Sequence, residues 1–234
     1  MELPTGKREL VRVYPVPYRY LNSEAQFPKH SWIESNFRKR PHSKDVRKDS
    51  YEIRRDFDLK ILEKYNVNQG TKKRKKEMWQ KRKEIILPFV SDSLSKIYQD
   101  YQRGGKTLGI IKPDKIIDLI IEEDERKNWS KKELKTLKQC NLFINERKPL
   151  QKIPYRFKYK FVSNNKTHTL SITDWEVNML YLNHIWKGDK NWKDKMRERL
   201  IDFMRERDLY LVVGNVHHTR SFIIIGLFYP PKGI

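Results

Sequence analysis

The sequence is poor in cysteine and in long apolar runs. Cys140 is the only cysteine among 234 residues, which excludes an internal disulfide and any zinc site that this chain would build from several cysteines. No apolar run approaches the roughly 18 residues that span a bilayer, and the longest clear one is Phe222 to Phe228. The first residues, Met1 to Arg8, contain no apolar segment of the kind that a secretory signal needs. We therefore expect a cytoplasmic protein in a reducing compartment.

Acidic side chains are also too few to balance the basic ones. Against 51 Lys and Arg there are 30 Asp and Glu, which leaves a net charge of +21. A field of this sign attracts polyanions and speeds encounter with them. Nucleic acid is the first partner to expect, and an anionic membrane surface is the second.

The positive charge is most concentrated between Thr71 and Lys83, where a single acid, Glu77, stands among many bases. The basic residues of this segment are Lys72, Lys73, Arg74, Lys75, Lys76, Lys81, Arg82 and Lys83. We expect the segment to begin as a mobile loop after Gly70 and to become a helix through Trp79. Like charges repel one another, and a polyanion relieves that repulsion, so we predict phosphate contacts that do not read bases. The alternative is a solvated, charged helix face.

The stretch Tyr155 to Phe161 alternates rings with cations. In a strand, alternate side chains point to opposite faces, so four aromatic residues line one face and Arg156, Lys158 and Lys160 the other. The expected arrangement buries the rings and leaves a basic face, which is either solvated or in contact with phosphates. The alternative leaves the ring face uncovered, as a surface on which unstacked bases pack.

The remaining patterns predict an α+β fold with mixed, mostly antiparallel sheets and flanking helices. We expect an N-terminal basic lobe over 1–148 and a C-terminal lobe over 149–234 with the order ββααββ. The expected strands cover 9–14, 107–111, 116–121, 153–162, 167–172, 209–216 and 222–229. The expected helices cover 91–102, a segment from 130, a segment from 173, and 192–207.

Two helix starts have capping-box spacing, Ser130 with Glu133 and Thr173 with Glu176. In the first of these helices Cys140 falls on the apolar stripe, which predicts a packing role rather than a nucleophile.

Two groups of residues, here called constellations, contain the side-chain types that a metal-dependent nuclease site needs. The first has carboxylates and a lysine of the right types, at Asp114 or Asp118, Glu125 and Lys127. Glu125 lies in an acidic run that is more typical of a strand end and turn, so these spacings are weak indicators.

The second constellation arises because the ββααββ order brings the first hairpin beside the last. Its members are His168, Asp174, Glu176 and His218. Helix capping explains the two acids, and a polar turn explains His218, so we assign no catalytic residue, no metal and no cofactor.

The chain resembles a family of uncharacterised prokaryotic proteins with conserved sequences. The matching motifs are Arg12-Val13-Tyr14-Pro15-Val16-Pro17-Tyr18-Arg19, Leu108-Gly109-Ile110-Ile111-Lys112-Pro113, Pro154-Tyr155-Arg156-Phe157 with Asp174-Trp175-Glu176, and Phe222 to Pro231. The resemblance implies no activity. Similar proteins carry two cysteines and a histidine in the hairpin before Asp-Trp-Glu, whereas here Ser163 and its neighbours stand in place of the cysteines and only His168 remains, which argues against zinc. They also have an extra strand before the first motif, so the first strand here is expected to present an open edge to a partner.

Three functions remain open. The first is a non-catalytic nucleic-acid-binding protein, a subunit of a larger nucleoprotein assembly. The second is a nuclease, and the third is a basic adaptor for an acidic protein partner. Steep salt dependence distinguishes the first from the third.

Overall fold

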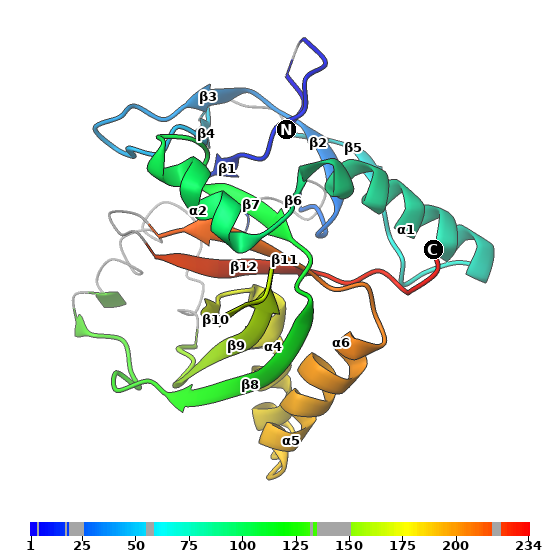
Figure 1. Ribbon diagram of the computed structural model, residues 1–234, viewed down its shortest axis with the longest axis vertical. Coiled ribbons are helices and arrows are strands. Elements are labelled where there is room, and N and C mark those ends of the chain that lie inside the picture. Colours follow the sequence, from blue (N-terminus) through cyan, green and yellow to red (C-terminus); the bar gives the residue numbers. More distant parts are fainter. Residues whose placement is uncertain are drawn as a thin grey trace.

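The computed structural model describes residues 1–3, 5–16, 18, 26–54, 59–131, 133–134, 151–216 and 221–234. Within them the strands form sheets of three, two and seven strands, most of them paired antiparallel, and helices pack around these sheets (Figure 1). The expected α+β class is confirmed. None of the described helices has the length and apolar content that crossing a membrane requires.

The N-terminal part carries the two small sheets and one long helix. The three-stranded sheet has the order β1 (Arg12–Val13), β4 (Ser50–Ile53) and β3 (Phe37–Lys39), and the two-stranded sheet joins β2 (Ser31–Glu34) to β5 (Lys60–Lys64). Strand β1 is shorter than the expected 9–14, because the Glu9 N–H donates to the carbonyl of Met1 and Pro15 has no N–H to donate. As expected, β1 lies at a sheet edge.

The seven-stranded sheet forms the centre of the molecule. Its order is β6 (Val90–Ser91), β7 (Leu108–Ile111), β11 (Tyr210–Asn215), β12 (Phe222–Phe228), β10 (Lys166–Ile172), β9 (Tyr155–Ser163) and β8 (Lys115–Glu123). Strand β8 pairs with β9, so the sheet takes strands from both sides of the lobe boundary expected at residue 148. That boundary and Cys140 both lie in 135–150, outside the described residues.

The C-terminal elements follow the expected ββααββ order. Strands β9 and β10 precede α4 (Trp175–Trp186), and β11 and β12 follow the second helical segment. This segment consists of α5 (Trp192–Arg197), a π-helical turn (Glu198–Asp202) and α6 (Phe203–Arg205). The hairpin between β9 and β10 turns at Asn164 and Asn165, whose positive φ angles of 49° and 58° suit a tight turn.

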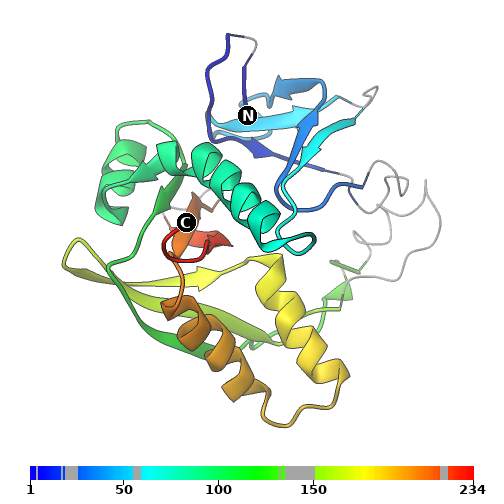
Figure 2. The same ribbon diagram turned by 90° about the vertical axis from the view of Figure 1, so that its right-hand side faces the viewer.

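Helices cover both faces of the sheet. On one face, α4, the second helical segment and α2 (Leu94–Gln102) bury the rings of β9, and Phe157, Tyr159 and Phe161 are at most 1% exposed. The expected burial of these rings is confirmed. On the other face, Ile110, Tyr210 and Phe228 pack beneath α1 (Lys72–Ile86). Figure 2 shows α1 crossing above the last residues of the chain, with α4 and α6 below them.

Two of the three cations of β9 are paired with acids. The antiparallel register sets Glu122 opposite Arg156. Glu122, near the end of β8, and Asp124, just after it, form ion pairs with two of the cations. Lys158 lies 2.5 Å from Glu122, and Arg156 lies 3.1 Å from Asp124. Lys160 lies opposite Asp118 in the register and is exposed. The neighbouring strand therefore neutralises most of the basic face that the sequence predicts.

A buried polar cluster joins β1 and β4 to the large sheet. The guanidinium of Arg12 lies 3.2 Å from Asp49 and donates to the backbone carbonyl of Thr107 at 2.9 Å. Asp49 also accepts the Thr107 N–H at 2.7 Å. Burial lowers the pKa of Arg12 to about 10, against the opposing effect of Asp49. Because a buried ion pair is costly to break, this cluster fixes the two parts of the chain relative to each other.

Candidate nucleic-acid interface

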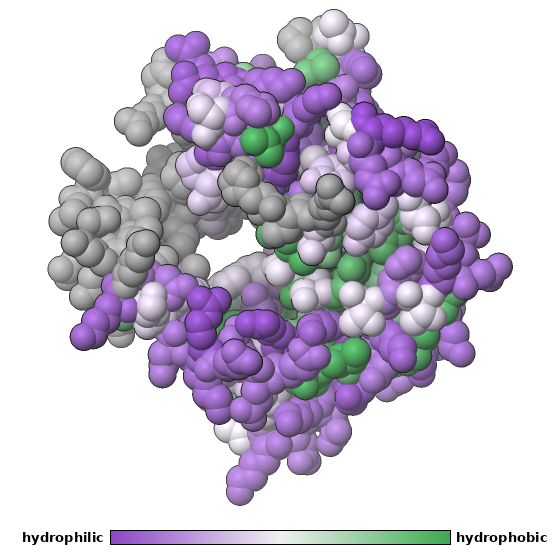
Figure 3. Space-filling model, turned by 60° about the vertical axis from the view of Figure 1, so that its left-hand side comes forward, coloured by the Kyte–Doolittle hydropathy of each residue, from purple (hydrophilic) through white to green (hydrophobic). Residues whose placement is uncertain are grey.

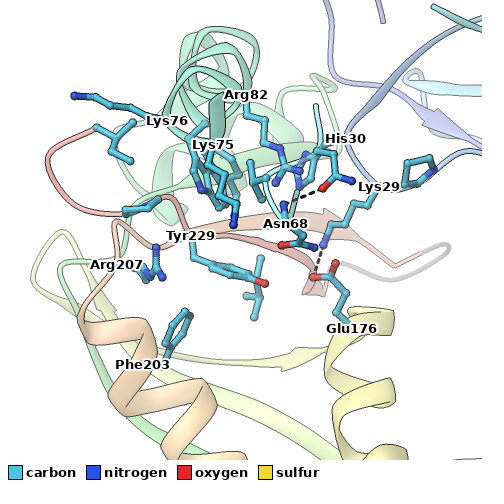
Figure 4. A pocket seen from close by; sticks show the side chains of 18 of the residues that line it. Lys29, His30, Asn68, Lys75, Lys76, Arg82, Glu176, Phe203, Arg207 and Tyr229 are labelled. Atoms are coloured by element: carbon cyan, nitrogen blue, oxygen red, sulfur yellow. Dashed lines mark hydrogen bonds and ion pairs between the residues drawn. The ribbon is translucent and has the colours of Figure 1, made fainter. Parts of the chain in front are cut away.

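A cleft of about 610 Å³ lies between α1 and the C-terminal elements (Figure 4). Helix α1 forms its roof, and Phe203, Tyr229, Pro231 and Ile234 contribute to the opposite wall. Seven of its lining residues are basic, namely Lys29, Lys72, Lys75, Lys76, Arg82, Arg199 and Arg207. Glu176 is the single acid among the lining residues.

Figure 3 shows another side of the molecule, where the described surface is mainly hydrophilic and hydrophobic residues gather in a hollow at its middle.

The basic segment at 71–83 is helical from Lys72, its first basic residue. Thr71 is the N-cap, and its hydroxyl accepts the N–H of Arg74 at 3.3 Å. The expected mobile loop at the start of the segment is therefore wrong, because this cap stabilises the first helical turn. That turn contains no acid, so the lysines lie at the helix end where the macrodipole is already positive. A bound anion would stabilise this arrangement.

The structure divides the eight basic residues of this segment by their surroundings. Lys72, Lys75, Lys76 and Arg82 line the cleft, whereas Lys73 and Arg74 are exposed and do not line it. Lys81 pairs with Glu63 at 2.6 Å, and Lys83 donates to the backbone carbonyl of Ile234. In Figure 4, Lys75 extends toward the ring of Tyr229, while Lys76 points away.

Arg82 is the most buried cation of the cleft. It is 8% exposed, and its Nε donates to the carbonyl of Tyr65 at 2.8 Å. Its guanidinium lies 4.8 Å from the ring of Trp79, and no described carboxylate pairs with it. Burial lowers the pKa of Arg82 to about 10, so it remains charged at neutral pH.

Arg199 and Arg207 both lie close to the ring of Phe203, and all three residues line the cleft. The guanidinium carbons of the two arginines are 3.7 Å and 4.6 Å from the centre of that ring. Neither arginine has a described carboxylate partner. Our sequence reasoning missed them as site residues, although the spacing of four between each arginine and Phe203 would place all three on one face of the helix expected over 192–207. In the structure α6 ends at Arg205, and Arg207 bridges to Pro231. The π-helical turn at 198–202 lies in this wall, and such turns are frequent at functional sites.

Aromatic rings connect the two walls. Tyr229 lies 6.1 Å from Phe203 and 6.4 Å from Trp79, measured between ring centres. His30 also lines the cleft, and burial lowers its pKa to about 3, with Arg82 and Lys29 acting in the same direction. The ring of His30 is therefore neutral at physiological pH.

One end of the cleft is crossed by an ion pair. The ammonium of Lys29 lies 2.9 Å from Glu176 and 3.3 Å from Asp174. Burial lowers the pKa of Lys29, but the two carboxylates outweigh that effect and the net pKa is raised. Lys29 is therefore occupied by protein carboxylates, unlike the other cations of the cleft.

The helix start at 173 differs from its expected form. Asp174, not Thr173, is the N-cap of α4, and its Oδ1 accepts the N–H of Glu176 at 2.9 Å. The N–H of Thr173 donates to the carbonyl of Ile224 in the sheet, so Thr173 belongs to the sheet and the N-cap falls on the next residue, Asp174. By contrast, the expected capping box at Ser130 and Glu133 is confirmed by reciprocal hydrogen bonds of 2.7 Å and 3.2 Å.

The first nuclease constellation does not assemble in the described residues. Asp118 pairs with Arg197 at 2.6 Å, and Lys127 pairs with Glu123 at 2.9 Å. Asp114 and Glu125 join neither pair. Across the described part of the chain, no three His, Cys, Asp or Glu residues are grouped in a way that could hold a metal ion.

The second constellation is also spread out. His168 lies within β10, where its ring is 5.6 Å from that of Phe161, and burial lowers its pKa. Asp174 and Glu176 lie beyond the end of that strand, at the start of α4 and in contact with Lys29. His218 lies outside the described residues.

Comparison with known proteins divides the chain near the end of α1. Residues 3–88 match a domain of unknown function (DUF8758), and residues 90–233 match another (DUF8757). The cleft is built from both segments, and the large sheet lies within the second. No curated protein and no solved structure matches the chain. Because the second match covers more than half of its 234 residues, the chain belongs to the DUF8757 family.

Proposed function

We propose that the protein is a non-catalytic nucleic-acid-binding protein that contacts phosphates through the cleft beneath α1, as a subunit of a larger nucleoprotein assembly. One observation carries the proposal. Apart from Lys29, which Glu176 pairs, the basic lining residues have no carboxylate partner in the described chain: Lys72, Lys75, Lys76, Arg82, Arg199 and Arg207. Cations held together without counter-charges favour a polyanionic ligand.

The rings of the cleft favour nucleic acid over an acidic protein partner. Trp79, Phe203 and Tyr229 lie among the cations, and bases stack on aromatic side chains, whereas carboxylates do not. The separated positions of Asp118, Lys127 and His168 favour binding without cleavage. The net charge of +21 exceeds the charge that a nucleic-acid segment bound in this one cleft would neutralise. The excess supports a place in a larger assembly.

The test is a binding titration with labelled single-stranded and double-stranded oligonucleotides over a range of salt concentrations. About five phosphate contacts with a single strand should lower the affinity about a hundredfold between 50 and 200 mM salt. Polyglutamate, an acidic polypeptide, is the competitor that distinguishes nucleic-acid binding from the adaptor function. Affinity that does not change with salt, or displacement by polyglutamate as efficient as by nucleic acid, would contradict the proposal. Incubation of the oligonucleotide with the protein and Mg²⁺ checks for cleavage.

A further inference from the structure

The inner part of the cleft contains a cation whose bonding is incomplete. Arg82 is 8% exposed, and its Nε and Nη2 both donate to the same carbonyl, that of Tyr65. Among the described residues Nη1 has no acceptor, and no carboxylate forms an ion pair with the guanidinium, on which Glu176 acts only through space. A buried cation without a paired carboxylate is costly, so this position favours an anion that reaches it from the cleft.

Two cross-connections join the walls of the cleft. Lys29 and Glu176 meet across one end, as Figure 4 shows. Pro231 and Ile234 line the cleft elsewhere, and Lys83 of α1 donates to the carbonyl of Ile234. The cleft volume of about 610 Å³ is in the range of pockets that hold one small ligand. Such a site suits the end of a strand better than a strand that passes through.

We propose that the cleft binds the phosphorylated end of a single nucleic-acid strand. The inference rests on the proposed function and specifies its ligand. The terminal phosphate lies against Arg82 and Lys75, and the first base lies against the ring of Tyr229. A terminal phosphate carries a charge of about −1.5 to −2 and three strong acceptor oxygens, so it satisfies an unpaired guanidinium better than an internal phosphodiester does. The terminal base must be unpaired to reach a ring.

The test compares short single strands of one sequence in four forms: 5′-phosphorylated, 3′-phosphorylated, unphosphorylated and covalently circular. One of the two phosphorylated strands should bind at least about tenfold more tightly than the unphosphorylated and circular strands, and the preferred form identifies the end that is bound. Inorganic phosphate should compete with that strand. Equal affinity for phosphorylated and circular strands would overturn the end-binding inference and leave the proposed function standing. No measurable binding of any form would overturn both.

Variants connect the preference to the cleft. Lys75→Gln should reduce the preference for the phosphorylated end, because Lys75 extends toward Tyr229, whereas Lys73→Gln on the same helix should keep it. Arg82→Gln should abolish the preference, with a thermal melt to check that this buried substitution leaves the protein folded. An undiminished preference in Lys75→Gln and in folded Arg82→Gln would overturn the assignment of the terminal phosphate to this cleft.

Discussion

The carboxylate of Asp174 accepts a hydrogen bond from the backbone N–H of Leu227 at 2.8 Å, and the two residues are 53 positions apart. Strand β10 leaves the sheet after Ile172, whereas the neighbouring strand β12 continues to Phe228. Asp174 therefore takes the place of the missing strand for the Leu227 N–H. The same carboxylate caps α4 and contacts Lys29, so one side chain ties together the sheet, a helix and the end of the cleft.

Asp174→Ala should lower the free energy of unfolding by about 2 to 4 kcal/mol. Loss of an N-cap costs about 1 kcal/mol, and a buried N–H left without an acceptor, here that of Leu227, costs about 1 to 3 kcal/mol. Urea unfolding measures the change. Glu176→Ala is the control, because the side chain of Glu176 is half exposed and its ion pair with Lys29 contributes little. Similar losses in both variants would show that Asp174 has no structural role beyond that of its surface neighbour.

Phe157→Ala should destabilise the protein by about 3 to 5 kcal/mol, because it removes a buried ring from the core of the large sheet. Arg156→Gln on the opposite face should leave stability nearly unchanged, since the pair that Arg156 forms with Asp124 is exposed. Thermal melts distinguish the two. Because Asp124 and Glu122 already hold Arg156 and Lys158, we further expect little loss of nucleic-acid affinity in Arg156→Gln. A melt of Phe157→Ala that matches the parent would contradict the burial of the ring.

Asp45→Asn should destabilise the protein in a pH-dependent way. The hydrogen bond from the Arg47 guanidinium lowers the pKa of Asp45 in the folded protein below its unfolded value of 3.8. The contribution to stability is therefore complete above that unfolded pKa and is lost as the pH falls through the folded pKa. At pH 6 the parent should exceed the variant by about 2 kcal/mol, and the gap should shrink below pH 4.

Urea unfolding at a series of pH values follows this difference. Asp92→Asn is the control, because the side chain of Asp92 is 83% exposed and pairs with Lys96 at the surface. This control should stay close to the parent at every pH. A gap between the parent and Asp45→Asn that is the same at pH 3 and pH 6 would refute the role assigned to the charge of Asp45.

Local patterns were sufficient to predict much of the fold. The alternation of rings and cations in β9 identified the buried face. Ser130 and Glu133 cap each other as their spacing predicts. In each case the interacting groups lie within a few residues of one another or follow directly from strand geometry.

The candidate site depends on contacts that the sequence does not encode locally. Lys29, Arg82 and Tyr229 come from segments far apart in the chain, and only the packing of α1 over β12 brings them together. Predicting that Asp124 neutralises Arg156 would have required the register between β8 and β9. A list of basic residues therefore could not separate those that line the cleft from those that protein acids already pair.

The most direct test of the cleft as the nucleic-acid interface compares two double variants of α1. Lys72→Gln with Lys75→Gln removes two charges that line the cleft, and Lys73→Gln with Arg74→Gln removes two that do not. The logarithm of the binding constant is measured against the logarithm of salt concentration. We predict that the first variant loses affinity for all sequences alike and flattens the slope by about 1.4 to 1.8, while the second keeps nearly the parental slope. Equal effects of the two variants, or no effect of either, would contradict the account.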